Sequence, residues 1–450
     1  MCIRDRLPTV WLRGGFASLY LDLDFARDLH EISNIWIGRI VWLGPELRSS
    51  FHIPPFYYYM FYPALWIGSG NVRAMIIFNI FLSLTVLFWL GWLGVKKRNL
   101  IWLLAVAVIG LTPYWQKISL HPGNGNTYVI FLLGTLVSLW FKKPIWLSSL
   151  FAGAAIALHP TSIFICPILI YEWLRKKRNY LKNFIITIAS LIIFWVPNLL
   201  FLVITKGYWI RQWLSEPNWD VFLSFDVVHN IKNILLLARL SGIHIILFFS
   251  IWLFIGFKTQ LKRLKIWYFI VSFFIILLAF FNPMPERYLY GITTMTLFVA
   301  VLSLVKRNKK VILFIYLTLL IINLFQNPPK IAERSIVTLE NNINTLIRER
   351  QINKKQKLAL LTVHEAYGGI TPGGGLIPQS NDYRFFLRTK GYKALDVSKY
   401  AQADILVIFL EDSDFDWQNW ICWELNEFGE KELKFATKVG ETKMLVFDKK

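Results

Sequence analysis

Residues 72–95 read VRAMIIFNIFLSLTVLFWLGWLGV and are followed at once by Lys96, Lys97 and Arg98. The stretch carries one charge, at Arg73. An α-helix needs about 20 apolar residues to cross the hydrocarbon core of a bilayer, and this stretch is longer. A cluster of Lys and Arg at the end of such a stretch is typical of a cytoplasmic loop. Residues 72–95 therefore predict a transmembrane helix whose second end lies at the cytoplasmic face.

Apolar blocks of this kind recur through most of the 450-residue chain. The sequence is 55% hydrophobic and 17% charged, whereas soluble domains have about 25% charged residues. A soluble protein with this sequence would have to bury every block in one large helical core. We therefore expect a polytopic α-helical membrane protein, with spans near residues 72–95, 100–115, 127–141, 145–158, 162–174, 184–204, 234–257, 266–281, 291–305 and 311–325.

The net charge is +21, and the basic residues lie mainly between the apolar blocks. The basic residues form clusters between the apolar blocks, and alternating the spans across a membrane puts every cluster on one side. This is the positive-inside distribution, so the charge indicates membrane topology and predicts no nucleic-acid partner. The clusters are 96–98, 142–143, 175–178, 262–265 and 306–310.

The two ends of the chain differ from its apolar middle. Residues 1–6, MCIRDR, resemble a translated assembly scar, and we expect the native first helix to be missing. Residues 7–70 are expected to form an outer-face loop, in which the aromatic stretch PPFYYYMFYPALWIG is an interfacial helix. In this prediction residues 71–326 are the multi-span membrane domain, and residues 327–450 form a domain on the extracytoplasmic side.

The polar segment 327–450 has the pattern of a small α/β domain. Residues 331–349 predict an amphipathic helix, and three apolar runs of strand length, LALLTV, ADILVIFL and KMLVFD, predict strands. The glycine-rich segment YGGITPGGGLIP does not have the spacing of a phosphate-binding loop and predicts a flexible turn.

A cluster of carboxylates precedes the first long apolar block. Asp24 and Asp28 are four residues apart, so on a helix they share one face, with Arg27 beside them. At an outer membrane surface such a carboxylate can act as a general base towards a hydroxyl or an amine. The same spacing also fits acidic residues that stabilise the first turn of a helix, and both interpretations stay open at this point.

Four segments carry a resemblance to a known family. They are Asp24-Phe25-Ala26-Arg27-Asp28, WLGPELRSSFHIPPFYYYMFYPAL, GAAIALHPTSIFICP and PERYLY. In this order they resemble motifs of the GT-C superfamily of membrane glycosyltransferases that use polyprenyl-phosphate sugars. The most similar branch contains bacterial relatives of protein O-mannosyltransferases and the aminoarabinose transferase that modifies lipid A. Phe25 departs from the glutamate usual at its position.

The resemblance implies a GT-C fold, with Asp24 and Asp28 as the catalytic residues. Asp24 would activate an acceptor that displaces the lipid phosphate with inversion at the sugar carbon, while Asp28 and Arg27 position the acceptor or Asp24. The implied donor is a polyprenyl-phosphate sugar in the cytoplasmic (inner) membrane, and the acceptor is a protein, lipid or glycan at its outer face. No cofactor and no metal are expected. The candidate substrate-binding residues are Arg27, His52, Lys117, Asn124, Asn126, Glu286, Arg287 and Tyr288.

The leaving phosphate needs hydrogen-bond donors, for which we expect Arg287 first, then His52 and Lys117. Each also has a structural interpretation, since Arg287 can pair with Glu286, His52 can bond at the interface and Lys117 can extend towards water. His159, in the motif GAAIALHPTSIFICP, is expected to be a structural hydrogen-bonding residue rather than a catalyst.

Two other classes of protein are alternatives to an enzyme. A lipid-linked-sugar flippase would carry ionisable residues at mid-membrane depth, and the expected spans carry few, Arg239 among them. A membrane-anchored scaffold would need neither this many spans nor a carboxylate cluster ahead of them. The sequence therefore favours a glycosyltransferase, with the flippase as the alternative.

Overall fold

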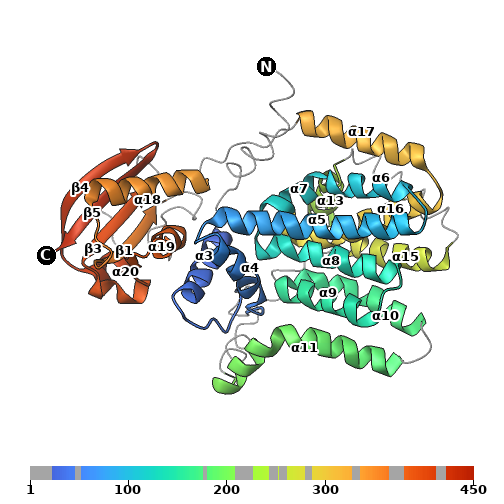
Figure 1. The fold of residues 1–450 in the computed structure, drawn as a ribbon, viewed down its shortest axis with the longest axis horizontal. Helices are drawn as coiled ribbons and strands as arrows, with labels where there is room; N and C mark the ends of the chain where they lie inside the picture. Colours follow the sequence, from blue (N-terminus) through green and yellow to red (C-terminus); the bar gives the residue numbers. More distant parts are fainter. Residues whose placement is uncertain are drawn as a thin grey trace. The chain divides into compact units, whose positions relative to one another are not determined.

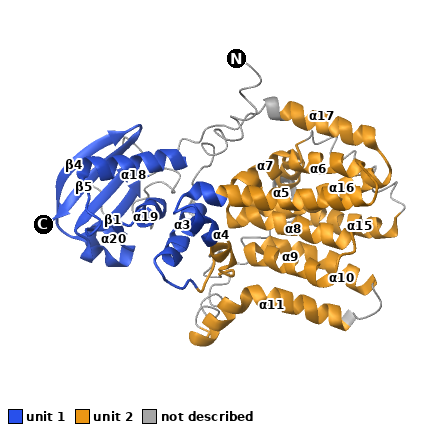
Figure 2. Ribbon diagram, in the orientation of Figure 1, with its two compact units in different colours: residues 1–41, 61–75, 329–450 blue, residues 42–60, 76–328 orange. Residues whose placement is uncertain are grey.

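The computed structural model describes residues 23–45, 52–175, 180–207, 227–242, 252, 261–278, 286–326, 335–363, 380–411 and 422–450. The chain divides into two compact units (Figure 2). Unit 1 consists of residues 1–41, 61–75 and 329–450, and unit 2 of residues 42–60 and 76–328. The predictions for residues 1–22 and for the glycine-rich segment 367–378 lie outside the described residues.

Unit 2 is a bundle of helices (Figure 1). Helix α4 (Phe56–Ile67) begins in unit 2 and ends in unit 1, and α5 (Val72–Lys96) begins in unit 1 and continues in unit 2. The other helices are α6 (Ile101–Gly110), α7 (Pro113–Leu120), α8 (Asn124–Trp140), α9 (Ile145–Leu158), η3 (Pro160–Ile165), α10 (Cys166–Arg175), α11 (Tyr180–Ile204), α13 (Val227–Leu240), α15 (Lys262–Leu277), α16 (Glu286–Lys306) and α17 (Lys310–Gln326).

The apolar helices of this bundle divide into central and peripheral ones. Helix α8 packs against α9 and α16, and α9 packs in turn against α11. Helix α16 is almost wholly buried, whereas α11 exposes most of its apolar side chains. Gly153 allows α9 and α11 to approach closely, because a Cβ atom there would lie 2.6 Å from the carbonyl oxygen of Ser190. An apolar helix with an exposed surface fits a lipid environment.

By length and composition, three described helices could cross a membrane, namely α5, residues 181–204 of α11, and α16. The pair α6 and α7 raises this number to four if it counts as one span. These helices support a multi-pass membrane protein, while the larger number of spans expected from the sequence stays a prediction.

Two expected spans are wrong as single helices. The span 100–115 is broken, since α6 and α7 meet at an angle of 65°. Pro113 begins α7, and proline lacks the N–H that would continue α6 and disfavours a helical residue before it. The span 234–257 is interrupted as well, because α13 ends at Leu240 and Gly242 adopts a positive φ of 76°.

The basic clusters lie together at one end of the bundle. Arg263 donates hydrogen bonds to the carbonyl oxygens of Leu139 and Trp140 at the end of α8, and Lys306 lies over the Trp140 ring. Lys96 and Lys143 both lie over the ring of Trp92, and Glu172 joins Arg175 to Arg263. The described members therefore share one end of the bundle, and their placement on one side of a membrane stays a prediction.

Unit 1 contains an α/β domain built on a five-stranded sheet of order β2-β1-β3-β5-β4. Strands β2, β1 and β3 are parallel, and β5 and β4 are antiparallel to their neighbours. The strands are β1 (Lys357–Val363), β2 (Lys393–Ala394), β3 (Ile405–Leu410), β4 (Lys431–Val439) and β5 (Thr442–Lys449). The helices of unit 1 outside those shared with unit 2 are α3 (Leu23–Trp36), α18 (Ile336–Arg350), α19 (Asn381–Thr389), η7 (Val397–Gln402) and α20 (Trp423–Phe428).

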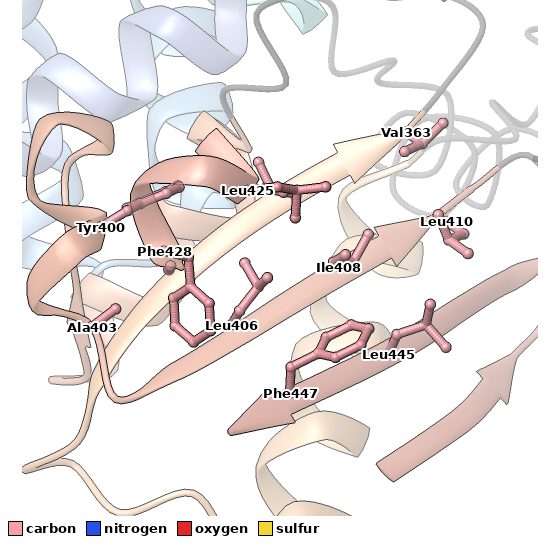
Figure 3. Close-up of a cluster of buried hydrophobic side chains, with 12 residues drawn as sticks. Val363, Tyr400, Ala403, Leu406, Ile408, Leu410, Leu425, Phe428, Leu445 and Phe447 are labelled. Atoms are coloured by element: carbon pink, nitrogen blue, oxygen red, sulfur yellow. The ribbon is translucent and has the colours of Figure 1, made fainter. Parts of the chain in front are cut away.

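Each face of the central strands is covered. On one face, Leu406 and Phe447 of the sheet pack with Tyr400 of η7 and Phe428 of α20 (Figure 3). On the other face, α19 packs its Tyr383 ring flat on Phe409, with ring centroids 3.7 Å apart. Strands buried on both faces read as continuous apolar runs, which is why LALLTV and ADILVIFL predicted β1 and β3 correctly. KMLVFD is confirmed as part of β5. The predicted helix 331–349 is confirmed as α18 over its described residues, which begin at residue 335.

Candidate functional site

The predicted catalytic residues lie on α3 in unit 1. Arg27 donates to Asp24 Oδ1 at 3.2 Å and to Asp28 Oδ1 at 3.1 Å, so one guanidinium joins both carboxylates. The helix and the shared face expected from the i,i+4 spacing are therefore confirmed. The Asp24 side chain is 34% exposed and the Asp28 side chain 1% exposed, so Asp24 is the more accessible carboxylate of the two.

This arrangement serves both interpretations of the acidic cluster. Asp24 lies in the first turn of α3, where a carboxylate stabilises the N-terminus of a helix. It is also held at a defined place by Arg27, which a general base requires. The catalytic roles of Asp24 and Asp28 stay predictions, and the structure shows that the buried Asp28 carboxylate pairs with Arg27.

The middle of α3 meets charged residues of the α/β domain. Burial, together with the charges of Arg388 and its neighbours, lowers the pKa of His30 to about 3. The hydrogen bonds from Arg39 and Arg388 hold the pKa of Asp396 below its usual value, against the opposing effect of burial. Burial raises the pKa of Glu31. His30 is therefore a neutral ring in a site where Asp396 only partly offsets the charges of the surrounding arginines.

The predicted donor-binding residues lie in unit 2, around the start of α16. Lys117 Nζ on α7 donates to Glu286 Oε2 at 2.5 Å, and the Tyr290 hydroxyl donates to the same oxygen at 3.3 Å. The structure thus brings Lys117 and Glu286 together. Both side chains remain partly exposed, so the pair can be reached by a ligand.

Arg287 and Tyr288 follow Glu286 in the first turn of α16. The guanidinium carbon of Arg287 lies 5.7 Å from the centre of the Tyr288 ring. Arg287 also lies against Gly125, where a Cβ atom would be 3.1 Å from its Cδ atom. The structure therefore places Arg287 beside the segment that holds Asn124 and Asn126. A residue with a side chain at position 125 would push the Arg287 stem away.

The two asparagines have different surroundings. Asn126 Nδ2 donates to the carbonyl oxygen of His121 at 3.0 Å, which closes the turn before α8. Asn124 is the first residue of α8 and is half-buried. Asn126 therefore acts as a turn-stabilising residue in this structure, and substrate binding by either asparagine stays a prediction.

His52 is tied to its own loop. Its Nδ1 atom lies 2.9 Å from the carbonyl oxygen of Gly44, and its own carbonyl oxygen accepts a bond of 3.1 Å from Asn198 Nδ2 on α11. Gly44 also lets the backbone of Pro54 approach closely, because a Cβ atom at position 44 would lie 2.1 Å from the carbonyl oxygen of Pro54. These contacts support the structural interpretation of His52, while its role as a phosphate donor is untested.

Sequence reasoning missed Tyr128. This buried α8 residue donates from its hydroxyl to the carbonyl oxygen of Arg287 at 3.1 Å and accepts from the N–H of Gly291 at 2.8 Å. The buried ring of His159 stacks on the Tyr128 ring, and its Nδ1 atom bonds Thr161, which donates to the Tyr128 hydroxyl. These contacts fit the structural hydrogen-bonding role expected of His159, which stays a prediction. The signal for Tyr128 was a hydroxyl inside an apolar span.

Among the residues that the structure describes, no group of three or more His, Cys, Asp or Glu side chains is placed to hold a metal ion. The candidate residues instead form two groups, carboxylates with one arginine on α3 and cationic residues with Glu286 around the start of α16. The first group can accept a proton. The second can pair with an anion, because Arg and Lys side chains donate charge-assisted hydrogen bonds to phosphate.

The chain therefore combines a bundle of apolar helices with a mixed-sheet α/β domain. Its structure is similar to that of ArnT from Cupriavidus metallidurans in the apo state, with a TM-score of 0.60, 9% sequence identity, and coverage of 98% of this chain and 96% of that one. A second structure, of the same protein bound to undecaprenyl phosphate, gives a TM-score of 0.61 and 7% identity over 99% of this chain and 97% of that one. No protein-family model and no curated protein matches the sequence. At such low identity the likeness shows a shared fold, which agrees with the GT-C fold that the motifs imply.

Proposed function

We propose that this protein transfers a monosaccharide from a polyprenyl-phosphate donor to an acceptor at the outer face of the cytoplasmic membrane. The observation that carries this proposal is the whole-chain likeness to a structure that binds undecaprenyl phosphate. The motif order and the two groups of candidate residues support it, because they supply a proton acceptor and cations for a phosphate.

In the proposed reaction, Asp24 takes the proton of an acceptor hydroxyl or amine as that atom attacks the anomeric carbon. The new bond forms from the acceptor to this carbon, while the bond from the carbon to the phosphate oxygen breaks and its electron pair leaves with the phosphate. The anomeric centre inverts. The leaving group changes from a phosphate diester to a monoester and gains negative charge, which cationic residues stabilise.

The candidate residues on α3 and around the start of α16 have roles in this proposal that fit their contacts. Arg27 fixes Asp24, and Asp28 holds Arg27 through a buried carboxylate. Arg287 and Lys117 bind the phosphate, and Glu286 holds Lys117 in place before the donor arrives. The Tyr288 ring supports the Arg287 guanidinium.

The test is sugar transfer by the full chain in proteoliposomes, supplied with a panel of undecaprenyl-phosphate monosaccharides and cell-envelope acceptors. Asp24→Asn keeps the size of the side chain and removes the proton acceptor, so we expect kcat to fall by about 10²–10⁴-fold. Asp448→Asn is the matched control, since the Asp448 side chain is also 34% exposed and pairs with Arg350 within the α/β domain.

Undiminished transfer by correctly inserted Asp24→Asn protein would return Asp24 to a helix-stabilising role. Failure of the wild type to transfer any sugar of the panel, or to bind undecaprenyl phosphate, would remove the support for a transferase.

A further inference from the structure

The second half of α3 lies against the α/β domain. Helix α3 packs on α19, and both helices belong to unit 1 (Figure 1). Ser33 on α3 is fully buried, and nearly all residues of α19 are buried as well. The helix that carries the candidate base is therefore attached to a domain that lies more than 300 residues later in the chain.

Arg388, in the last turn of α19, makes the polar part of this attachment. Its side chain is 5% exposed. Nη1 donates to Ser33 Oγ at 3.2 Å and to Asn34 Oδ1 at 3.1 Å, both on α3. Nε donates to the carbonyl oxygen of Ala394 at 2.9 Å, and Nη2 to Asp396 Oδ1 at 2.6 Å. One buried guanidinium thus bonds the domain with two of its nitrogens and α3 with the third.

Asp396 extends the attachment past the end of α3. Its second oxygen accepts a bond of 2.8 Å from Arg39, which follows α3 in the chain, and Arg39 also donates to Asn34 Oδ1 at 3.2 Å. The carboxylate therefore bridges Arg388 and Arg39. Because both arginines also contact Asn34, the C-terminal end of α3 is fixed in position and in rotation about its axis.

A helix of this size depends on such contacts. α3 has 14 residues, and isolated helices shorter than about 12–15 residues are marginal in water. Both halves of α3 bury side chains, Phe25 and Leu29 in the first and Ile32 and Ser33 in the second, whereas Asp24 in the first turn is partly exposed. Asn34 is ten positions after Asp24, about 15 Å along the helix axis at about 1.5 Å per residue. A rotation of α3 at Asn34 would therefore move Asp24 as well.

We propose that Arg388 is a positioning residue for Asp24, through which the α/β domain sets the place of α3. This proposal rests on the proposed function for the role of Asp24, but the attachment itself is a separate property of the fold. The α/β domain then contributes to catalysis without touching the reacting atoms. Any acceptor that binds the domain and shifts α19 would also shift the base.

The experiment combines a structural and a kinetic measurement on the full chain in nanodiscs. Arg388→Met keeps an unbranched side chain and removes every hydrogen bond of the guanidinium, while Arg388→Lys keeps the charge. Arg350→Met is the matched control, because Arg350 is a partly buried arginine of the same domain that pairs with Asp448 instead of α3. Amide hydrogen exchange is followed in α3 and, as an internal reference, in strands β1 and β3.

For Arg388→Met we expect exchange in α3 to become faster by about tenfold or more, with β1 and β3 unchanged. We expect kcat to fall by about tenfold with an unchanged KM for the donor, since the donor-binding residues lie outside α3. Arg388→Lys should recover part of both properties, and Arg350→Met should change neither.

Unchanged α3 exchange in Arg388→Met would overturn the proposal, and so would faster exchange with an unchanged kcat. If β1 and β3 also exchange faster, the domain itself has loosened, and the double variant Ser33→Ala/Asn34→Ala decides instead, because it leaves the bonds of Arg388 within the domain in place. A wild type that transfers no sugar contradicts the proposed function, whereas the exchange data still decide whether Arg388 holds α3.

Discussion

Lowering the pH from 7.5 to 5.5 should loosen the contact between α3 and α19 through His30. The His30 ring lies between Arg388 Nη1, 3.5 Å from its Nδ1 atom, and Asp396 Oδ1, 3.6 Å from its Nε2 atom. Burial and the charges of Arg384, Arg388 and Arg39 disfavour a second positive charge there, and Asp396 only partly offsets them. The packed state therefore keeps His30 neutral, with its pKa lowered to about 3.

The sign and size of the effect follow from the difference in bound protons. When α3 detaches, His30 regains its ordinary pKa of about 6.5 and binds a proton below that pH. The stabilisation of the contact is therefore complete above pH 6.5 and is lost as the pH falls towards 3. At pH 5.5 the detached state gains a factor of about 11, or about 1.4 kcal/mol, and at pH 7.5 almost nothing. Opening of α3 should become about tenfold more frequent.

Amide hydrogen exchange of the α3 peptide at the two pH values, corrected for intrinsic exchange rates, measures this opening. His30→Gln cannot bind a proton and serves as the reference, so the pH effect is the difference between the two proteins. The reference also removes the contribution of Glu31, whose raised pKa works in the opposite direction. Equal pH dependence in wild type and His30→Gln would refute the reasoning.

Two further substitutions test the bundle. Glu172→Ala removes the buried carboxylate that pairs with Arg263 at 2.6 Å and accepts from Trp267 Nε1 at 3.1 Å. Because Arg263 loses its buried counter-charge, the substitution should destabilise the protein by about 3–5 kcal/mol and lower its Tm in detergent. Tyr128→Phe removes the hydroxyl between Arg287 and Gly291 and should cost only about 1 kcal/mol, since their backbone groups can then bond each other. It should raise the KM for the donor in transfer assays, because the first turn of α16 shifts.

Both substitutions have clear controls. Glu349→Ala removes a carboxylate from an exposed pair with Arg348 and should change stability by less than about 0.5 kcal/mol. A Tm in Glu172→Ala equal to that of Glu349→Ala would contradict the buried-pair interpretation. For Tyr128→Phe, an unchanged KM together with an unchanged affinity for undecaprenyl phosphate would separate Tyr128 from the donor site.

Local patterns predicted much of the fold, and the failures have identifiable causes. The span 145–158 has the same bounds as α9, because a continuous apolar block between Pro144 and His159 leaves one place for the helix. The prediction of one helix over 100–115 was wrong at Pro113. The apolar composition continues through this residue, but proline has no N–H to continue the helical hydrogen bonds. Helix α19 was missed, since several of its buried residues are polar or charged and give no apolar periodicity.

The candidate site was predicted in part for the same reason. Arg27 was correctly placed beside Asp24 and Asp28, because residues three or four apart on a helix are neighbours. The pairing of Arg287 with Glu286 was considered, but the structure gives Glu286 to Lys117, which is 169 positions away. No local rule contains that information.

The sequence by itself determined the apolar helices, the common end of the basic clusters, the central strands and the face of α3 that carries the carboxylates. These follow from hydrophobicity, charge and short-range spacing, which act between residues close in the chain. Only the tertiary structure decided that Arg388 bonds to Ser33 and Asn34, and that the Tyr128 hydroxyl lies between Arg287 and Gly291. A buried polar group must find a partner wherever packing brings one, and packing joins residues hundreds of positions apart.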